Sequence, residues 1–402
     1  MEFLSPDIGL VVELRSLGKQ WPIAGPEEEK ALLEVLHSGK WCRVTHQDRP
    51  SKVDEFENAF ASYQDAKFGI AVTNGTQALE IAFKAAGVKP GDEVIVPALT
   101  FVATATAAIL VNAVPVIVDA DPETYNISPD AIEAAITDKT RVICPVHNGG
   151  YAADMDRIMA IAREHNLMVV EDCAHAQGTQ WKGKGVGSIG HFGCFSFQQG
   201  KTMTAGEGGI ILTNDEDLAA EAYSYHNIGR IANRPFTEFH KVATNARMTE
   251  FQAAILLAQL SRMDEQVAIR ERNTAYLAEG MREIPGLAPL ERDPRMTRWC
   301  FYYWNFKYKQ DEFAGLPRNT FIRALSAEGV RVGVGAHGGP IYRNPVLQGK
   351  GLARVCDCPE AQRIIDTEAL SLAHSLFLGD RAEMDLILAA MRKIRENVGE
   401  LL

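Results

Sequence analysis

The stretch Phe195-Ser-Phe-Gln-Gln-Gly-Lys-Thr-Met-Thr-Ala-Gly-Glu-Gly-Gly209 places one lysine between an apolar run and a glycine-rich turn. Lys201 is the only lysine or arginine between His191 and Asn214. A lysine amine attacks an aldehyde only when it is neutral, so it needs burial or a positive neighbour that lowers its pKa. The small residues around Lys201 favour such a reactive lysine. The alternative is an exposed loop lysine, because lysine is almost never buried without a partner.

Upstream, Leu167-Met-Val-Val-Glu-Asp-Cys-Ala-His175 predicts a buried strand that ends on two carboxylates. Ligands of open α/β sheets bind at the carboxyl ends of the strands. A carboxylate there can pair with the ring nitrogen of pyridoxal phosphate (PLP) and keep the ring protonated. Successive strand side chains face opposite ways, so only one of Glu171 and Asp172 can do this, and the spacing does not choose between them. The alternative is a carboxylate that caps the next turn.

A third strand end lies in Ala71-Val-Thr-Asn-Gly-Thr-Gln-Ala-Leu79 and leads into a predicted helix through Asn74-Gly75-Thr76. Free amides at a helix N-terminus bind anions, and the Thr76 hydroxyl adds a donor. Asn, Gly and Thr also form simple helix caps, which is the alternative interpretation. Together, the three strand ends predict a phosphate cradle, a carboxylate and a reactive lysine.

Short apolar runs alternate with helical patterns along most of the chain, which predicts an α/β fold. The helical patterns include residues 77–86, 129–136 and 155–165. Apolar strands that alternate with helices favour a mainly parallel sheet, here of seven strands, with helices on both faces. The seven predicted strands are 68–73, 93–97, 115–118, 142–146, 167–171, 192–197 and 209–213.

The C-terminal third of the chain has a different pattern. One long helix is predicted from Thr249 to about Met281, because apolar residues repeat there at helical spacing. The aromatic run Trp299–Trp304 predicts a strand, and two helical patterns follow it. The predicted parts are an N-terminal segment (1–60) that packs with the small domain, a large PLP-binding domain (61–280) and a small α+β C-terminal domain (281–402).

The composition limits the class of protein. The 402 residues carry a net charge of -11, from 41 basic and 52 acidic side chains, without a dense Lys/Arg block. Nucleic-acid binding requires a basic surface that neutralises phosphates, so nucleic acid is not an expected partner. The seven cysteines are scattered, and the isolated pair Cys356 and Cys358 does not predict a zinc site, so no metal is expected. This cysteine usage is typical of a reducing cytoplasm.

The sequence does not predict contact with a membrane. The N-terminus, Met-Glu-Phe-Leu-Ser-Pro-Asp, has no basic region, and Glu13 interrupts the apolar stretch that follows, so no signal peptide is expected. Val94–Val118 has no charged residue and is long enough to span a bilayer. However, Pro97, Pro115 and several polar residues divide it into a strand, a helix and a strand, as in a buried α/β core.

These motifs, in this order, resemble those of the sugar aminotransferase family of fold-type I PLP enzymes, the DegT family. The resemblance extends from about Trp21 to the C-terminus. It implies a fold-type I PLP-dependent transferase, and Lys201 is specific to the family in combination with the Asp-x-x-His pattern at 172–175. Three further stretches carry the resemblance: Val96-Pro-Ala-Leu-Thr-Phe-Val-Ala-Thr104, Pro145-Val-His-Asn-Gly-Gly150 and Asn245-Ala-Arg-Met-Thr-Glu-Phe-Gln-Ala-Ala254.

The family pattern implies roles for the reactive groups. Lys201 would hold PLP as a Schiff base and then shuttle protons. Asp172, rather than Glu171, would pair with the ring nitrogen, and His175 would lie beside the phenolic oxygen of the cofactor. One branch of the family replaces the lysine with histidine and carries out dehydration, so Lys201 argues against that branch.

The family pattern also implies the residues that hold the cofactor in place. Gly75, Thr76 and Ser196 would hold the phosphate. Phe101 would stack on the ring. Asn245 would reach the phosphate from the neighbouring subunit, which implies a homodimer with shared active sites.

The Ser-Phe-Gln-x-x-Lys form, followed by Thr-Ala-Gly-Glu-Gly-Gly, resembles the subgroup that acts on scyllo-inosose-type cyclitol ketones. It also resembles synthases of 3-amino-5-hydroxybenzoate. The implied function is an aminotransferase that moves an amino group from L-glutamine or L-glutamate to a cyclic polyhydroxy ketone. Many nucleotide-sugar members carry a His-Tyr-x-Pro-x-His-like segment where this chain reads Ala336-His-Gly-Gly-Pro340, which argues against a nucleotide-linked substrate.

Alternatives remain at this level. The enzyme alternatives are a nucleotide-sugar aminotransferase and an aminodehydratase similar to 3-amino-5-hydroxybenzoate synthase. A PLP-binding sensor without turnover is the alternative of another class, and the retention of Lys201 beside the Asp172 motif argues against it. His147, Asn148 and Tyr342 are candidates for hydrogen bonds to ring hydroxyls, with ordinary loop hydrogen bonding as their alternative.

Overall fold

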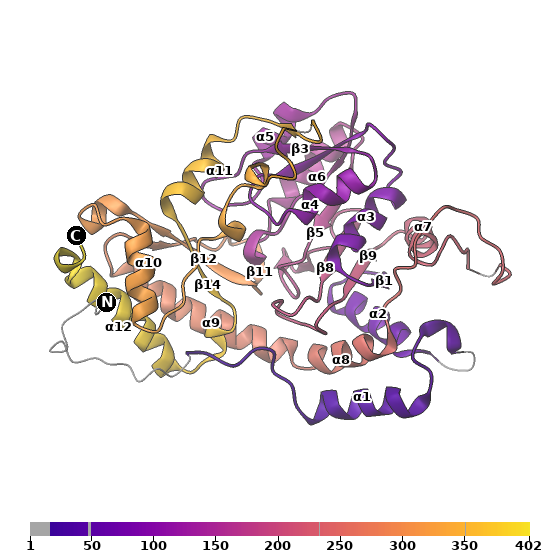
Figure 1. Cartoon of the computed structure of the whole chain (residues 1–402), viewed down its shortest axis with the longest axis horizontal. Helices are drawn as coiled ribbons and strands as arrows, with labels where there is room; N and C mark the ends of the chain where they lie inside the picture. The colour runs from indigo at the N-terminus through magenta and orange to yellow at the C-terminus, as the bar shows by residue number, and fades with distance from the viewer. Residues whose placement is uncertain (1–16, 47–49, 233, 350) are drawn as a thin grey trace.

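The computed structural model describes residues 17–402 apart from 47–49, 233 and 350. The N-terminal stretch for which no signal peptide is predicted lies outside the described residues. Figure 1 shows a large sheet with helices on both faces and, at the other end of the molecule, a smaller sheet with its own helices.

The large sheet contains the seven predicted strands and one more. All of its strands run in one direction except β9, which is antiparallel to both of its neighbours. The additional strand, β13, has only two residues and pairs Arg354 with Val116 at the edge of the sheet, so its sequence carries no periodic signal. From edge to edge the strands are β1 (Phe68–Val72), β9 (Gly209–Thr213), β8 (Phe192–Ser196), β5 (Met168–Asp172), β4 (Thr140–Ile143), β2 (Glu93–Pro97), β3 (Val114–Val118) and β13 (Arg354–Val355).

Side chains on the two faces of the large sheet enter two apolar layers. Val94 and Val96 of β2 pack into one layer, whereas Ile95 between them packs into the other. Burial on both faces explains why these strands are continuous apolar runs in the sequence. One layer is covered by α3 (Gly75–Ala85), α4 (Ala103–Leu110) and α7 (Glu216–His226), and the other by α2 (Lys52–Tyr63), α5 (Pro129–Ala135) and α6 (Met155–Glu164).

The smaller sheet is antiparallel, and its central strand is β12. Trp304 and Phe306 of β12 are fully buried in the apolar core beneath the helices that cover this sheet. The strands, in spatial order, are β10 (Leu287–Pro289), β12 (Tyr303–Tyr308) and β14 (Ala369–Ala373). Helices α10 (Arg318–Ala327) and α12 (Arg381–Glu396) belong to this region. In contrast, α11 (Pro359–Arg363) lies beside the large sheet, where the amides of Glu360 and Ala361 donate to the Asp119 carboxylate directly after β3.

The prediction of a strand over Trp299–Trp304 is wrong for most of its length. β12 begins only at Tyr303, and residues 299–302 connect it to a short strand, β11 (Met296–Arg298). In this connection the amide of Tyr302 donates to the Gly149 carbonyl, which belongs to a loop of the large sheet. The backbone therefore pairs with that loop instead of a neighbouring strand, which the sequence pattern does not reveal.

The prediction of one long helix over Thr249–Met281 is also wrong, because two helices occupy it: α8 (Glu250–Leu260) and α9 (Met263–Arg282). The Ser261 hydroxyl donates to the Ala258 carbonyl at 2.7 Å, the acceptor that the Arg262 amide would use in a continuous helix. The Arg262 amide donates to Gln259 instead. A serine that bonds back to the preceding turn competes with the helix in this way.

The N-terminal part of the described chain contacts both halves of the molecule. The amides of Gly18 and Lys19 donate to the Glu383 carboxylate and the Ser375 carbonyl near the C-terminus. In contrast, α1 (Pro26–Ser38) packs on α8, and α2 packs on α8 and β1. The three-part division of the chain stays a prediction.

The segment considered as a membrane span, Val94–Val118, forms β2, α4 and β3, in agreement with the prediction. Within the described ranges, no helix is both long and apolar enough to cross a bilayer. All seven cysteines are described, and each is a free thiol.

Candidate active site

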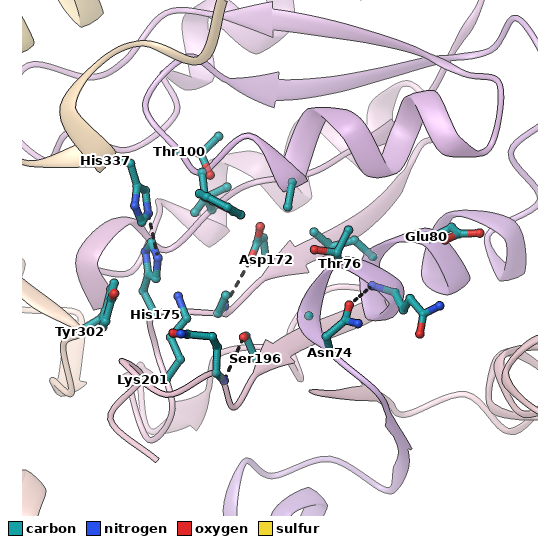
Figure 2. Close-up of a pocket in the computed structure, with 18 of the residues that line it drawn as sticks. Asn74, Thr76, Glu80, Thr100, Asp172, His175, Ser196, Lys201, Tyr302 and His337 are labelled. Carbon is teal, nitrogen blue, oxygen red and sulfur yellow. Dashed lines mark hydrogen bonds between the residues drawn. The ribbon is translucent and has the colours of Figure 1, made fainter. Parts of the chain in front are cut away.

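A cavity of about 750 Å³ lies at the carboxyl ends of β1, β5 and β8 (Figure 2). Strand ends of the large sheet, the start of α3 and the loop after β8 supply most of its lining. This agrees with the rule that open α/β sheets bind ligands at that edge. Seven of the eight predicted site residues line it: Gly75, Thr76, Phe101, Asp172, His175, Ser196 and Lys201.

Lys201 is buried, with 8% of its surface exposed, so the interpretation of an exposed loop lysine is wrong. Burial lowers the pKa of Lys201 to about 8, although the Asp172 carboxylate acts in the opposite direction. The Lys201 ammonium lies 4.2 Å from the centre of the Tyr302 ring. At pH 7, Lys201 would then be a neutral amine in about one protein molecule in ten, a far larger fraction than at the ordinary pKa of lysine.

The two adjacent carboxylates of β5 face opposite ways, as strand geometry requires. Glu171 points away from the cavity and accepts hydrogen bonds from the amides of Gly187, Ile189 and Gly190. Asp172 lines the cavity. Of the two carboxylates, only Asp172 can contact a ligand in this cavity, and its role beside the ring nitrogen stays a prediction.

Asp172 is buried and has two hydrogen-bond donors. The Thr104 hydroxyl donates to Oδ2 at 2.8 Å, and the Ala174 amide donates to Oδ1 at 3.1 Å. Burial raises the pKa of Asp172, and these two bonds and the charge of Lys201 act against that rise. No Lys or Arg side chain forms an ion pair with Asp172 in the described part of the chain. A buried carboxylate without an ion-pair partner fits a cationic ligand group.

The start of α3 forms the end of the cavity opposite His175 (Figure 2). The Asn74 side chain accepts a hydrogen bond from the Gln77 amide and caps the helix. The amides of Gly75 and Thr76 belong to the first turn, where no intrahelical acceptor exists. A side chain at Gly75 would place its Cβ 2.8 Å from the Cβ of Ser196, so glycine lets the helix start approach Ser196 closely. The capping interpretation is therefore confirmed at this helix, and the anion site stays a prediction.

An aromatic wall closes the other end of the cavity. The ring of His175 stacks on Tyr302, with centroids 4.9 Å apart, and His337 Nε2 lies 3.4 Å from His175 Nε2. The Phe101 ring lies 5.2 Å from that of His337. His175 Nδ1 accepts from the Gly149 amide, so its proton is on Nε2, and burial keeps the His175 pKa well below its usual range.

Two residues of this wall, Tyr302 and His337, are not among the predicted site residues. Tyr302 lies in the aromatic run that was assigned to a strand, and His337 lies in the segment that departs from the nucleotide-sugar pattern. Thr104 was also missed as the partner of Asp172, although it belongs to one of the quoted family stretches. One signal for Thr104 exists in the sequence: it lies in the helix that follows a predicted strand, and that helix begins at the same edge of the sheet as Asp172.

Asn245 does not line this cavity. It is exposed, and its backbone forms an isolated bridge with Asn227 beyond α7. A position on the surface is compatible with the predicted contact to a second subunit, which stays a prediction. The three candidates for ring-hydroxyl contacts, His147, Asn148 and Tyr342, do not line the cavity either.

The buried positions of His147 and Asn148 show why that expectation is wrong. His147 Nε2 donates to Glu171 at 3.0 Å, and Nδ1 accepts from the Ala153 amide. Asn148 bonds to the Tyr125 carbonyl and to the Tyr303 hydroxyl. Both side chains are thus used within the protein, as their loop-hydrogen-bonding alternative predicts.

One cluster of possible metal ligands exists among the described residues: His147, Glu171 and Cys173. Both His147 nitrogens already have hydrogen-bond partners, and the Glu171 carboxylate accepts three backbone amides. Burial raises the pKa of the Cys173 thiol well above its usual range, so it is not a ready thiolate ligand. The chemistry of this donor set therefore does not fit a metal ion.

Comparison with known proteins agrees with this geometry. The model of the DegT/DnrJ/EryC1/StrS aminotransferase family matches residues 22–391. An L-glutamine:scyllo-inosose aminotransferase of Streptomyces griseus is 36% identical over 406 residues, covering 95% of each chain. A GDP-perosamine synthase of Caulobacter vibrioides is 43% identical over 276 residues, covering 69% of this chain and 74% of that protein.

Solved structures give the same result. The structure of 3-amino-5-hydroxybenzoic acid synthase superposes with a TM-score of 0.85 at 35% identity, covering 94% of this chain and 99% of that one. A Streptococcus pneumoniae protein described as a sugar aminotransferase, solved in its PLP form, gives 0.82 at 25% identity, covering 95% and 98%. The large mainly parallel sheet is that of the fold-type I PLP-dependent transferases. The chain therefore belongs to the DegT/DnrJ/EryC1/StrS aminotransferase family.

Proposed function

We propose that this protein is a PLP-dependent aminotransferase that moves an amino group from L-glutamine or L-glutamate to a cyclic polyhydroxy ketone. The observation that carries the proposal is the burial of Lys201 in a cavity that also contains Asp172 and the start of α3. Burial lowers the pKa of Lys201 to about 8, which supplies the neutral amine that reaction with an aldehyde requires.

The residues of the cavity fit PLP. The start of α3 offers free amides and the Thr76 hydroxyl to a phosphate, next to Ser196. Asp172, buried without an ion-pair partner, fits a protonated ring nitrogen. When bound, PLP supplies an electron sink for the carbon that exchanges its amino group.

The side chains of this chain would divide the remaining work. Lys201 would bind the cofactor and, once free, would carry a proton on Nζ between donor and acceptor carbons. Thr104 holds the Asp172 carboxylate through Oδ2, so that Asp172 would keep its charge beside the ring nitrogen. The stacked rings of His175 and Tyr302 would cover the face of the cavity near Lys201.

The proposed acceptor is a keto-cyclitol or a similar keto-sugar without a nucleotide. The relative from Streptomyces griseus is named as an aminotransferase of scyllo-inosose with L-glutamine as donor, which supports this choice. The charge of the cavity supports it as well. Lys201 is the only lysine or arginine that lines the cavity among the described residues, and Glu80 and Glu207 lie on its lining. A diphosphate would need cationic partners there.

The second candidate is a nucleotide-sugar aminotransferase. It is favoured by the 43% identity to the GDP-perosamine synthase, over a shorter match. The similarity to 3-amino-5-hydroxybenzoic acid synthase keeps an aminodehydratase as a further alternative. A PLP sensor without turnover is the least favoured, because Lys201 and Asp172 face one cavity.

The deciding experiment uses purified protein with PLP and L-glutamine. We expect a higher kcat/KM for scyllo-inosose-type ketones than for nucleotide-linked 4-keto sugars. A preference for the nucleotide sugar by about 100-fold, roughly 3 kcal/mol in transition-state binding, would contradict the acceptor but not the cofactor. Absence of product from any ketone, with PLP bound, would support the sensor.

We also propose that the active protein is a homodimer in the cytoplasm, with Asn245 of each subunit at the active site of the other. Asn245 is exposed and does not line the cavity of its own chain, which supports shared sites. The free cysteines agree with a reducing compartment. Size-exclusion chromatography with light scattering would measure the oligomeric state.

A further inference from the structure

The loop that carries Lys201 is held by side chains from distant parts of the chain. The Gly200 carbonyl, next to Lys201, accepts a hydrogen bond from His374 Nε2 at 3.0 Å. The carbonyl of the preceding residue, Gln199, accepts from Trp21 Nε1 at 3.0 Å. Trp21 and His374 also contact each other, with ring centroids 4.6 Å apart and an edge-to-face angle of 88°. Two consecutive carbonyls before Lys201 are thus fixed from outside the loop.

Behind His374 lies a buried arginine. Arg270 of α9 has no exposed surface, and its Nη2 lies 3.1 Å from His374 Nδ1. No carboxylate forms an ion pair with Arg270 in the described ranges of the chain. A buried charge without a counter-ion is costly, so Arg270 does not stabilise the fold through an ion pair.

The chemistry of arginine fixes the direction of the hydrogen bonds from Arg270 through His374 to Gly200. A guanidinium only donates hydrogen bonds, so His374 Nδ1 must accept the bond from Arg270. The proton of the neutral His374 ring is then on Nε2, which is the atom that faces the Gly200 carbonyl. Burial and the charge of Arg270 keep the pKa of His374 well below its usual range, so the ring stays neutral.

We propose that Arg270 and His374 are positioning residues that, together with Trp21, lock the peptide before Lys201 and keep its side chain in the buried cavity. This inference rests on the proposed function, because it assigns a purpose to the burial of Lys201. Without the bond to the Gly200 carbonyl, the loop can move outward, and Lys201 becomes more hydrated.

Hydration would change the reactivity of Lys201 in a pH-dependent way. The ionisable groups that face Lys201 from the packed elements are Asp172, His175, Tyr302, His337 and His374. Burial lowers the pKa of Lys201 and the Asp172 carboxyl acts in the opposite direction, so burial is the main cause of the lowered Lys201 pKa. A more hydrated Lys201 would therefore have a higher pKa and less neutral amine at pH 7, but a similar amount above pH 10.

The test measures the rate at which PLP attaches to Lys201, from the absorbance change when PLP is added to protein from which the cofactor has been removed. For His374→Ala we expect a rate at least fivefold lower than wild type at pH 7 and less than twofold lower at pH 10. The methionine in Arg270→Met is of similar length but uncharged. This variant should also attach PLP more slowly at pH 7 than at pH 10, relative to wild type, but by a smaller factor than His374→Ala. His374→Gln, whose amide can still donate to the Gly200 carbonyl, should restore most of the rate at pH 7.

Asn273→Ala is the matched control. Asn273 also lies on α9 and donates to the carbonyls of Phe377 and Gly379, a few residues after His374. Its loss therefore loosens the packing of α9 on the segment after His374, without removing a hydrogen bond to the Lys201 loop. We expect a lower melting temperature but an unchanged pH profile of attachment. A deficit in His374→Ala that is equal at pH 7 and pH 10, or is shared by Asn273→Ala, would overturn the proposal.

A second measurement does not depend on catalysis. The ¹⁵N spectrum of histidine-labelled protein should show His374 neutral at pH 7 with its proton on Nε2, and Arg270→Met should mix the two tautomers. A proton on Nδ1, or a cationic ring, would contradict the proposed direction. If wild-type protein binds no PLP but shows this tautomer, the proposed function fails while the hydrogen-bonded arrangement stands.

Discussion

The two walls of the active-site cavity are built in different ways. The strand-end wall, formed by Asp172, Ser196 and Gly75, consists of the last residues of β5 and β8 and the first residue of α3. The loop wall, formed by Tyr302 and His337, comes from a connection before β12 and from a single turn of helix. Both walls meet at Lys201.

The two walls also differ in how firmly their residues are held in place. The backbone of Asp172 and Ser196 is fixed by the hydrogen-bond ladder of the sheet, and Gly75 packs directly against Ser196, so this wall has little freedom. The loop wall belongs to a different sheet and its connections, and small shifts of those segments change the width of the cavity. We therefore expect variants of the strand-end wall to impair cofactor chemistry, and variants of the loop wall to change the affinity for the acceptor.

The largest effect is expected at the meeting point of the walls. Lys201→Ala removes the only side-chain amine that lines the cavity among the residues that the structure describes, and it should lower kcat by at least about 10³-fold. Borohydride reduction of wild type should trap PLP on the peptide that contains Lys201. Lys184→Ala, an exposed lysine on another short strand, is the control and should behave as wild type. Trapping on a different lysine would refute the assignment.

The next effect tests the strand-end wall itself. Asp172→Asn keeps the shape of the side chain but removes the charge that a protonated ring nitrogen requires, so kcat should fall by about 100-fold while PLP still binds. Absorbance of bound PLP and steady-state rates measure the two parts separately. Near-normal turnover would show that another group holds the ring nitrogen.

The neighbouring residue gives a contrasting control for that variant. Glu171→Gln cannot accept all the amide hydrogen bonds that the carboxylate receives, so it should destabilise the fold by about 2 kcal/mol. The remaining folded protein should keep its turnover number, because Glu171 faces away from the cavity. Equal loss of turnover in both variants would mean that strand distortion, and not charge, explains the effect of Asp172→Asn.

The sequence predicted the strand-end wall well for a physical reason. Each of its residues follows a continuous apolar run, and parallel strands align their ends at one edge, so order along the chain translates into proximity. The alternation of side chains along β5 shows that Glu171 and Asp172 face opposite ways, but not which of them faces the cavity. The burial of Lys201 likewise depended on what covers the loop.

The loop wall could not be predicted because its geometry depends on contacts between distant segments. Tyr302 is placed by a hydrogen bond to Gly149, more than 150 positions earlier, and no local pattern encodes that pairing. The same applies to the break at Ser261. The periodicity of apolar residues predicts one helix through this position, but the hydrogen bond of the Ser261 hydroxyl to the Ala258 carbonyl accompanies the end of the first helix. Prediction from sequence was therefore reliable where the ladder sets the geometry and failed where single tertiary contacts do.

Asn245 tests whether the strand-end wall is complete within one subunit. If Asn245 acts at the site of the neighbouring subunit, Asn245→Ala should lower activity about tenfold, mainly through weaker PLP binding. Mixing and refolding it with Lys201→Ala should restore up to about a quarter of wild-type activity, because half of the dimers are hybrids with one intact site. No recovery from the mixture, with Asn245→Ala itself impaired, would place Asn245 within its own subunit or away from the site.

The smallest effect is expected on the loop wall, where His337→Ala should raise the KM for the ketone about fivefold. The His337 ring contacts neither Asp172 nor the start of α3, but it lies against Phe101 and His175, which are predicted to touch the cofactor. PLP binding should therefore weaken by less than the KM for the ketone rises. His337→Gln keeps a hydrogen-bonding group at this position and should lie between wild type and alanine. Tyr342→Phe, on a separate cavity beside Cys356, is the control and should leave the KM unchanged. A fall in kcat with an altered PLP spectrum, instead of a higher KM, would show that His337 serves the cofactor, and the functional distinction between the two walls would then be wrong.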